Sequence, residues 1–252
     1  MDGFIHRTRR EVAPDAVHVP DWLDIDGQRR LVAACRAWAR PGADGRPGMC
    51  VTRLPGGAMM SVRTVCLGWH WYPYGYSRTI DRGDGSGPPV AALPDWLADL
   101  GRRAVADAYQ DPTITYRPDI ALVTYYDASA KMGLHQDRDE LSQEPVVSLS
   151  LGDACVFRFG NTEHRQRPWT DVELSSGDLF VFGDASRLAF HGVPKICPGT
   201  GDPSIGLAQG RLNITLRVSG LERGARDPLR QPGSIIGPGD HEISRPVGTG
   251  GR

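Results

Sequence analysis

Three side chains in the sequence offer metal-binding chemistry. His135 and Asp137 are separated by one residue, and in an extended strand residues i and i+2 project from the same face, so both could bind one ion. His191 follows an apolar run at 188–190 and precedes Gly192, which predicts a histidine at the end of a strand. Two histidines and one carboxylate form the facial triad that leaves three coordination positions of an Fe(II) ion open.

Each of these residues also has an ordinary structural explanation. In a chain with seven histidines and 30 acidic residues, an H-x-D pair can arise by chance. A single histidine at a strand end is commonly a hydrogen-bonded core residue. The metal site therefore requires that His191 lie beside His135 and Asp137 in the fold.

The segment 211–218 alternates strictly between polar and apolar residues. Its apolar side carries Leu212, Ile214, Leu216 and Val218, and its polar side carries Arg211, Asn213, Thr215 and Arg217. In an ordinary half-exposed strand the polar side would meet water. If that side lined a barrel interior instead, the two arginines would need an anionic ligand to avoid unpaired buried charge, and a small dicarboxylate fits that need.

Two helices and many short strands must position these residues. Apolar residues at helical spacing predict one helix from about Asp26 that ends at Pro41 and Gly42, and a second from Asp95 to about Tyr109. Short apolar or alternating runs predict strands at 119–126, 146–151, 155–159, 179–182, 187–191 and 211–218. The fold class is therefore mainly β with flanking helices (α+β), as an antiparallel sandwich or barrel. The region 43–90 is rich in glycine, proline and aromatic residues, which indicates short strands and turns.

Composition narrows the class of protein. A length of 252 residues with 40% hydrophobic residues suffices for one large domain or two small ones. The net charge of −1 gives no overall polyanion-binding signature, so any nucleic-acid surface must be local. The five cysteines are odd in number and lack CxxC spacing, so we expect core residues rather than a disulfide framework or zinc site. No signal-like or eighteen-residue apolar run occurs, and we expect a cytoplasmic monomer without membrane contact.

Several motifs together resemble one family, the AlkB-like Fe(II)/2-oxoglutarate-dependent dioxygenases, particularly the bacterial DNA-repair type. The matching segments lie at 57–62, 67–69, 75–77, 126–140, 147–152, 186–192 and 211–217, and they span most of residues 20–220 in order. The resemblance implies a double-stranded β-helix (jelly-roll) catalytic core at 117–220. An N-terminal extension with a nucleotide-recognition lid would occupy 1–116. The tail at 221–252 is read as irregular.

The resemblance also implies roles for individual residues. His135, Asp137 and His191 correspond to the iron ligands, and the cofactors would be Fe(II), 2-oxoglutarate as co-substrate and O₂. The residues implied to hold 2-oxoglutarate are Tyr126, Arg211, Asn213 and Arg217. Those implied to contact the substrate are Trp69, which would stack on a flipped base, with Tyr76, Ser77, Arg78, Asp139 and His164. Without the resemblance, Trp69 would be read as core packing, Ser77 and Arg78 as a loop, and Asp139 with Glu140 as a solvated turn.

The implied activity is oxidative removal of alkyl groups from DNA bases of the 1-methyladenine and 3-methylcytosine type. The reaction would release formaldehyde, succinate and CO₂, and the partner would be alkylated DNA, single-stranded or with the base flipped out. Two residues depart from the family pattern. Thr124 stands near the co-substrate, where the change should be tolerated, and His164 stands at a basic substrate position, which leaves base preference open. The alternatives are the same chemistry on RNA, a protein or a small molecule, or a non-catalytic jelly-roll binding module.

Overall fold

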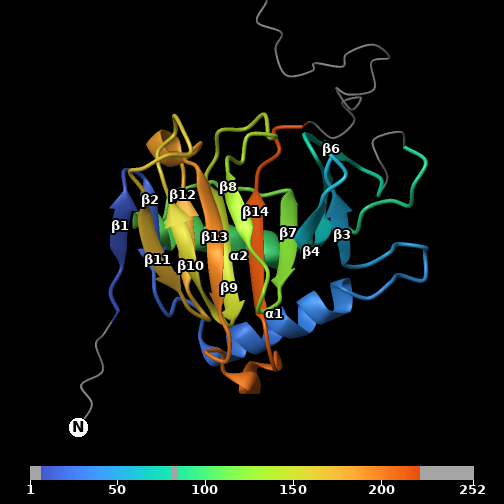
Figure 1. The fold of residues 1–252 in the computed structure, drawn as a ribbon, viewed down its shortest axis with the longest axis horizontal. Helices are drawn as coiled ribbons and strands as arrows, with labels where there is room; N and C mark the ends of the chain where they lie inside the picture. The colour runs from blue at the N-terminus through green and yellow to red at the C-terminus, as the bar shows by residue number, and fades with distance from the viewer. Residues whose placement is uncertain (1–6, 81–84, 222–252) are drawn as a thin grey trace, which may run out of the picture.

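The computed structural model describes residues 7–80 and 85–221, which form two facing antiparallel sheets, two helices and a small hairpin (Figure 1). The helices are α1 (Ile25–Trp38) and α2 (Asp95–Tyr109). The strands before residue 110 are β1 (Arg10–Ala13), β2 (Ala16–Val19), β3 (Cys50–Arg53), β4 (Met59–Leu67), β5 (His70–Tyr72) and β6 (Gly75–Ser77). Those after it are β7 (Ile120–Tyr126), β8 (Met132–His135), β9 (Val146–Gly152), β10 (Ala154–Phe159), β11 (Thr170–Leu174), β12 (Leu179–Phe182), β13 (His191–Cys197) and β14 (Arg211–Arg217).

The larger sheet has the order β1-β2-β12-β9-β14-β7-β4-β3, and the smaller sheet has the order β11-β10-β13-β8. The β5–β6 hairpin stands apart from both. Strands from the first 70 residues thus supply both edges of the larger sheet, and β4 pairs directly with β7. The larger sheet therefore runs across the domain boundary expected at residues 116 and 117.

The larger sheet is covered by the helices on one face and by the smaller sheet on the other. The side chains of its strands alternate between these two sides. On β14, the apolar residues Leu212, Ile214 and Leu216 join the core cluster that includes both helices. The alternate residues face the space between the two sheets. In β12, Leu179 and Val181 pack toward the helices, and Phe180 and Phe182 belong to a second core cluster that the two sheets share. Because side chains alternate with a period of two, the register gives β12 and β14 a helix side and an interior side.

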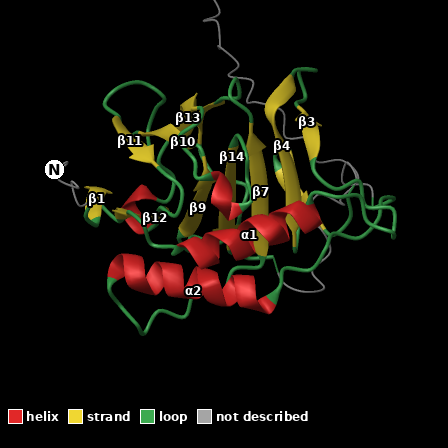
Figure 2. Cartoon of the chain, turned by 90° about the horizontal axis from the view of Figure 1, so that it is seen from below, coloured by secondary structure: helices red, strands yellow, loops and turns green. Residues whose placement is uncertain are grey.

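Helices α1 and α2 lie side by side across the outer face of the larger sheet (Figure 2). Asp24 caps α1, since its carboxylate accepts a hydrogen bond from the main-chain N–H of Gly27. Trp38 and Trp96 stack between the two helices, with ring centroids 6.0 Å apart. The mainly β class with two flanking helices and a jelly-roll core is confirmed.

Some predicted elements were wrong or missed. The strand expected at 187–191 is absent: Asp184–Ser186 form a short 3-10 helix, residues 187–188 form a turn, and His191 begins β13 instead of ending a strand. The reason is that Arg187 is buried and holds other loops through its guanidinium. Strand β8 was not anticipated because its four residues, MGLH, are only partly buried and lack alternation. Cys50 is exposed on an edge strand, so it is not a core residue.

The expected irregular tail lies outside the described residues from 222 onward. In the described parts of the chain, neither helix is long and apolar enough to cross a membrane.

The buried carboxylate of Asp178 holds the N-terminal segment against the rest of the larger sheet. Asp178 is inaccessible and accepts hydrogen bonds from Arg7, from His18 and from the main-chain N–H groups of Asp21 and Ser175. Burial by itself would raise the pKa of Asp178, but these hydrogen bonds outweigh it and lower the pKa.

We expect Asp178→Asn to lower the free energy of unfolding by about 2 kcal/mol at pH 7, because the hydrogen bonds to a charged acceptor are lost. Since the folded pKa is depressed, the carboxylate stabilises the fold fully above its unfolded pKa of about 4, and this contribution disappears as pH falls further. Urea unfolding at pH 7 and at about pH 3 should therefore show a difference between the variant and the native chain that narrows in acid. Asp26→Asn, at an exposed ion pair, serves as the control. An equal difference at both pH values would contradict the assignment.

Candidate active site

The structure brings the three metal-ligating candidates together between the two sheets. His135 ends β8 and His191 begins β13, and they are directly paired across the two strands, with ring centroids 4.5 Å apart. Asp137 follows two residues after β8, and its two carboxylate oxygens lie 3.6 Å from Nε2 of His135 and 3.6 Å from Nε2 of His191. One ligand atom from each residue falls within 4.8 Å of the others. This spacing fits a single ion bound by two imidazoles and a carboxylate.

A glycine allows this close approach. A Cβ added at Gly192 would lie 2.6 Å from the carbonyl oxygen of Met132 and 2.9 Å from the carbonyl carbon of Gly133. Any other residue would therefore push β13 away from β8, beside the paired histidines.

Both imidazoles are oriented by main-chain carbonyls. Nδ1 of His135 lies 2.9 Å from the Gly133 oxygen, and Nδ1 of His191 lies 2.9 Å from the Ala189 oxygen. Because a carbonyl can only accept, each Nδ1 carries the proton and each Nε2 keeps a lone pair directed at the site. Burial lowers the pKa of His191 to about 4, so its ring is neutral at physiological pH, as a metal ligand must be.

Asp137 is held by a buried chain of charges. Its Oδ2 lies 2.7 Å from Nη2 of Arg217, whose Nη1 donates to Oε1 of Glu140 at 2.9 Å. Glu140 also accepts from Arg187 at 3.0 Å and from the hydroxyl of Tyr76. Burial would raise the pKa of Asp137, but Arg217 and the two histidines lower it to about 2, so the carboxylate is ionised.

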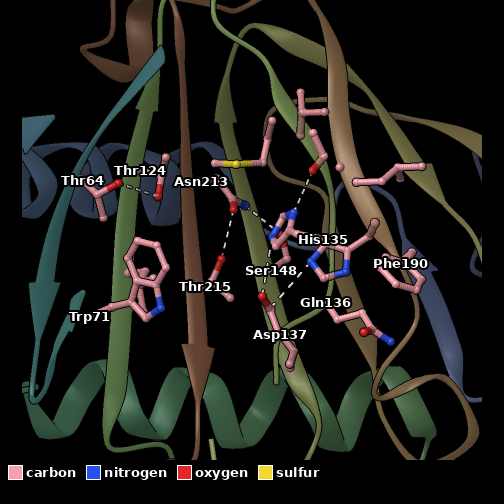
Figure 3. Close-up of a pocket in the computed structure, with 18 of the residues that line it drawn as sticks. Thr64, Trp71, Thr124, His135, Gln136, Asp137, Ser148, Phe190, Asn213 and Thr215 are labelled. Carbon is pink, nitrogen blue, oxygen red and sulfur yellow. Dashed lines mark hydrogen bonds and ion pairs between the residues drawn. The ribbon is translucent and has the colours of Figure 1, made fainter. Parts of the chain in front are cut away.

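A cavity of about 460 Å³ opens beside the triad, and the polar side of β14 lines it (Figure 3). Arg211 is 1% exposed, and its Nη2 donates to Ser150 at 2.9 Å. Its Nε and Nη1 have no hydrogen-bond partner among the described residues. A buried guanidinium with two unpaired donors is costly unless an anion binds there, and a carboxylate matches its planar geometry.

The other residues expected to hold 2-oxoglutarate lie in the same cavity wall. Asn213 donates to Ser148 and to the carbonyl of Leu149, and it accepts a hydrogen bond from Thr215. Tyr126 is buried and lines the cavity, and burial raises its pKa. Of the two arginines, Arg217 pairs with Asp137 and Glu140 and leaves its Nε without a partner among the described residues, whereas Arg211 has no carboxylate partner there and leaves both Nε and Nη1 unpaired.

The structure separates the two tryptophans at the start of the β5–β6 hairpin. Trp69 is 3% exposed and is not part of the cavity wall; its Nε1 donates to Asp119 at 2.9 Å, and Arg78 covers its ring at 3.5 Å. Trp71, two residues later, does line the cavity, and its Nε1 donates to Asp139 at 2.8 Å. Figure 3 shows Trp71 across Asn213 and Thr215 from His135 and Asp137.

Of the other residues expected to contact the substrate, Asp139 lines the cavity and the rest lie outside its wall. Asp139 lines the cavity, and burial raises the pKa of its carboxyl group. Tyr76 and Ser77 are buried away from the cavity wall, Tyr76 against Glu140 and Ser77 against Thr79. His164 is exposed on the loop between β10 and β11, outside the cavity.

Thr124, the other departure from the family pattern, lies in the cavity wall. Its hydroxyl is 3.4 Å from that of Thr64 on the neighbouring strand β4. It therefore presents a small polar group beside the proposed co-substrate position.

Sequence reasoning missed three residues that organise the site. Glu140 was weighed as part of a solvated turn, yet it is fully buried between Arg187 and Arg217. Arg187 lies within the matching segment 186–192, but no role of its own was predicted for it. Trp71 has no signal of its own in the sequence, and only its contact with Asp139 in the structure distinguishes it. A search for acidic residues that could neutralise the buried arginines would have found Glu140.

Comparison with known proteins agrees with this geometry. The model of the 2OG-Fe(II) oxygenase superfamily matches residues 15–217. An alpha-ketoglutarate-dependent dioxygenase AlkB homolog from Caulobacter vibrioides is 41% identical over 202 residues, covering 79% of this chain and 84% of the relative. The chain belongs to the AlkB-like 2OG-Fe(II) oxygenases. The solved structure of OsALKBH1 matches with a TM-score of 0.70 and 31% identity, over 83% of this chain and 99% of that one.

A further relative of this AlkB-like oxygenase is named DNA N(6)-methyladenine demethylase ALKBH1D, from Arabidopsis thaliana. It is 30% identical over 232 residues, and the match covers 84% of this chain and 51% of the relative. The chain thus spans about half the length of that relative. As an Fe(II)/2-oxoglutarate-dependent dioxygenase, the protein uses Fe(II), 2-oxoglutarate and O₂. Its two histidines and one carboxylate fit an iron ion, and the two unpaired donors of Arg211 fit a carboxylate of 2-oxoglutarate.

We expect Arg211→Met to weaken 2-oxoglutarate binding about 10- to 100-fold, because charge-assisted hydrogen bonds to a carboxylate are lost. The same change should not lower the melting temperature of the ligand-free protein, since it removes two unpaired buried donors. Calorimetric titration with 2-oxoglutarate and thermal unfolding would measure both. Arg102→Met, on the exposed side of α2, is the control. Unchanged 2-oxoglutarate affinity would rule out the proposed anchor.

Proposed function

We propose that this oxygenase removes N-methyl groups from nucleobases in DNA. The observation that carries the proposal is that an indole and a carboxylate lie next to each other in the cavity wall that faces the triad. Trp71 and Asp139 line one cavity with His135, Asp137 and His191. A flat aromatic face with a hydrogen-bond acceptor at its edge is suited to a flipped base.

The electrostatics of this wall favour a cationic base. Methylation on the Watson–Crick edge of adenine or cytosine leaves a positively charged ring. Such a ring gains a cation–π interaction with Trp71 and attraction from Asp139. Burial raises the pKa of Asp139, which means that its ionised form is poorly solvated, and a cationic ring alongside would stabilise that form. We therefore propose 1-methyladenine and 3-methylcytosine as the first substrates to test.

His135, Asp137 and His191 would hold the iron, and Arg211 would anchor the remote carboxylate of 2-oxoglutarate. Arg217 keeps Asp137 ionised and fixed in orientation through their 2.7 Å contact. Iron, 2-oxoglutarate and O₂ would together supply the oxidation: one oxygen atom of O₂ would enter the N-methyl group to give N-hydroxymethyl, and the other would enter succinate as 2-oxoglutarate loses CO₂. The hydroxymethylated base would then lose formaldehyde. For a cationic 1-methyladenine or 3-methylcytosine, the bond between the ring nitrogen and the CH₂OH carbon breaks, its electron pair stays on the ring nitrogen and the hydroxyl proton is released, so the neutral base is restored. No side-chain nucleophile is required.

The chain's own residues shape the space in which this oxidation occurs. Met60, Leu122 and Phe182 give the cavity apolar surface on several sides. Such walls limit water near the reacting methyl group, which protects a reactive site from side reactions.

The deciding experiment is incubation of the protein with a 3-methylcytosine oligonucleotide, Fe(II), ascorbate and 2-oxoglutarate, read by mass spectrometry. We expect loss of one methyl group per lesion together with equimolar succinate. Asp137→Ala, which removes a proposed ligand, should form neither product. A native chain that makes succinate without demethylating any oligonucleotide would retain the oxygenase activity but refute the substrate.

A second candidate substrate is N6-methyladenine in DNA. It is favoured by the relatedness to the Arabidopsis protein that bears this activity in its name. N6-methyladenine is uncharged, so it would gain less from Asp139 and Trp71 than a cationic lesion does. The same assay on matched DNA and RNA oligomers with each modification separates the candidates.

The base-stacking role expected for Trp69 is reassigned in this proposal to Trp71. We expect Trp71→Ala to lower kcat/KM for a methylated oligonucleotide about 10-fold or more, because stacking contributes roughly 1–3 kcal/mol per base. Iron and 2-oxoglutarate affinities should be preserved. Trp69→Ala should instead lower the melting temperature, since that side chain is 3% exposed and packed in the core. Equal losses of turnover in both variants, at unchanged stability, would contradict the reassignment.

A further inference from the structure

The loop between β10 and β11 is fixed in place beside the metal site. The main chains of Gly160 and Asn161 exchange hydrogen bonds of 2.8 Å with that of Phe190, the residue before His191. Gln136, which lies between His135 and Asp137, donates to the carbonyl of Thr162 at 3.0 Å. The loop is therefore attached to both ligand-bearing segments.

The side chain of Asn161 organises the loop internally. Its oxygen accepts from the main-chain N–H groups of Glu163 and His164, and its amide nitrogen lies 3.3 Å from the carbonyl oxygen of Gln166. These contacts give the exposed residues that follow a defined path across the surface.

Three arginines on this loop and on β10 rest against aromatic rings. The guanidinium of Arg165 lies 5.7 Å from the ring of Phe190, and both residues line the mouth of the cavity. Farther from the cavity, the guanidinium groups of Arg167 and Arg158 lie 5.2 Å and 4.6 Å from the ring of Trp169. We call Arg165, Arg167, Trp169 and Arg158 the arginine strip.

The strip carries uncompensated positive charge. Arg158 forms a bidentate pair with Asp171 at 2.7 and 2.8 Å. Arg167 lies near enough to lower the pKa of Asp171 but forms no ion pair, and neither does Arg165, within residues 7–80 and 85–221. Arg165 and Arg167 are both exposed, and their guanidinium groups lie against aromatic rings instead of carboxylates. The loop contains one acidic residue, Glu163, so its two arginines leave a net positive charge.

We propose that the arginine strip binds the phosphates of nucleotides that flank the flipped base, on one side of the lesion, in a single strand of nucleic acid. This inference rests on the proposed function and extends it beyond the flipped nucleotide. The strip begins at the cavity mouth and leads away from it, as a strand leaving the flipped base must. Arginine binds phosphate through a planar fork, and the whole chain is nearly neutral, so local charge of this kind has to provide the attraction.

Binding of a fluorescent single strand of about 15 nucleotides with one 3-methylcytosine, in DNA and RNA versions, tests the proposal across salt concentrations. For Arg165→Gln with Arg167→Gln we expect roughly tenfold weaker binding at about 50 mM salt. The slope of log Kd against log salt should fall by about 1.4, because each of the two lost phosphate contacts accounts for about 0.7 of it. Replacing the same two residues by lysine should restore the slope, because the charge returns.

The matched control is Arg30→Gln with Arg102→Gln, which removes the same charge from the helix face of the protein. It should bind with the affinity and salt slope of the native chain. If the strip variant matches the native chain while the native chain binds and demethylates the strand, the strip is not the phosphate site and the proposed function stands. Equal losses in both double variants would indicate a general charge effect and would also overturn the strip. If the native chain neither binds nor demethylates any strand, both proposals fail.

Discussion

Buried charge that must be partnered is the constraint on which this site depends. Asp137 can stay ionised inside the protein because Arg217 and two histidines surround it, and Arg217 can be buried because Asp137 and Glu140 balance it. Glu140 in turn is balanced by Arg187. Removing any one member would leave an uncompensated charge where water cannot solvate it, which makes the chain of contacts interdependent. The orientation of the metal site is thus a consequence of electrostatic neutrality in the interior.

The two sheets give these charges their positions. A larger sheet covered by helices on one face and by a second sheet on the other leaves its alternate side chains in a shared interior. Apolar residues fill one end of that interior, and the polar side of β14 opens the other end into the cavity. The direct pairing of His135 with His191 is possible because β8 and β13 are hydrogen-bonded neighbours with a glycine at the closest approach. The scaffold therefore supplies rigidity that loops alone would not.

The residues proposed to contact the substrate come from other segments than the three candidate metal ligands. The residues that face the cavity opposite the triad come from a short hairpin and from the segment after β8, and the arginine strip comes from another loop. The hairpin and the loop are both attached to the segment that follows β8, the hairpin by Tyr76 to Glu140 and the loop by Thr162 to Gln136. A nearly neutral protein can in this way present a local positive surface beside a metal site whose own charges are balanced.

The sequence by itself determined what depends on near neighbours in the chain. Helical periodicity gave α1 and α2, strict alternation separated the two sides of β14, and residue types indicated two histidines, a carboxylate and two arginines for iron and a dicarboxylate. Only the tertiary structure decided that Glu140 is buried, that His191 begins a strand, and that Trp71 instead of Trp69 faces the cavity. These outcomes depend on contacts between segments far apart in the sequence, such as Arg187 with Glu140. Burial and register are properties of the packed whole, so local pattern does not contain them.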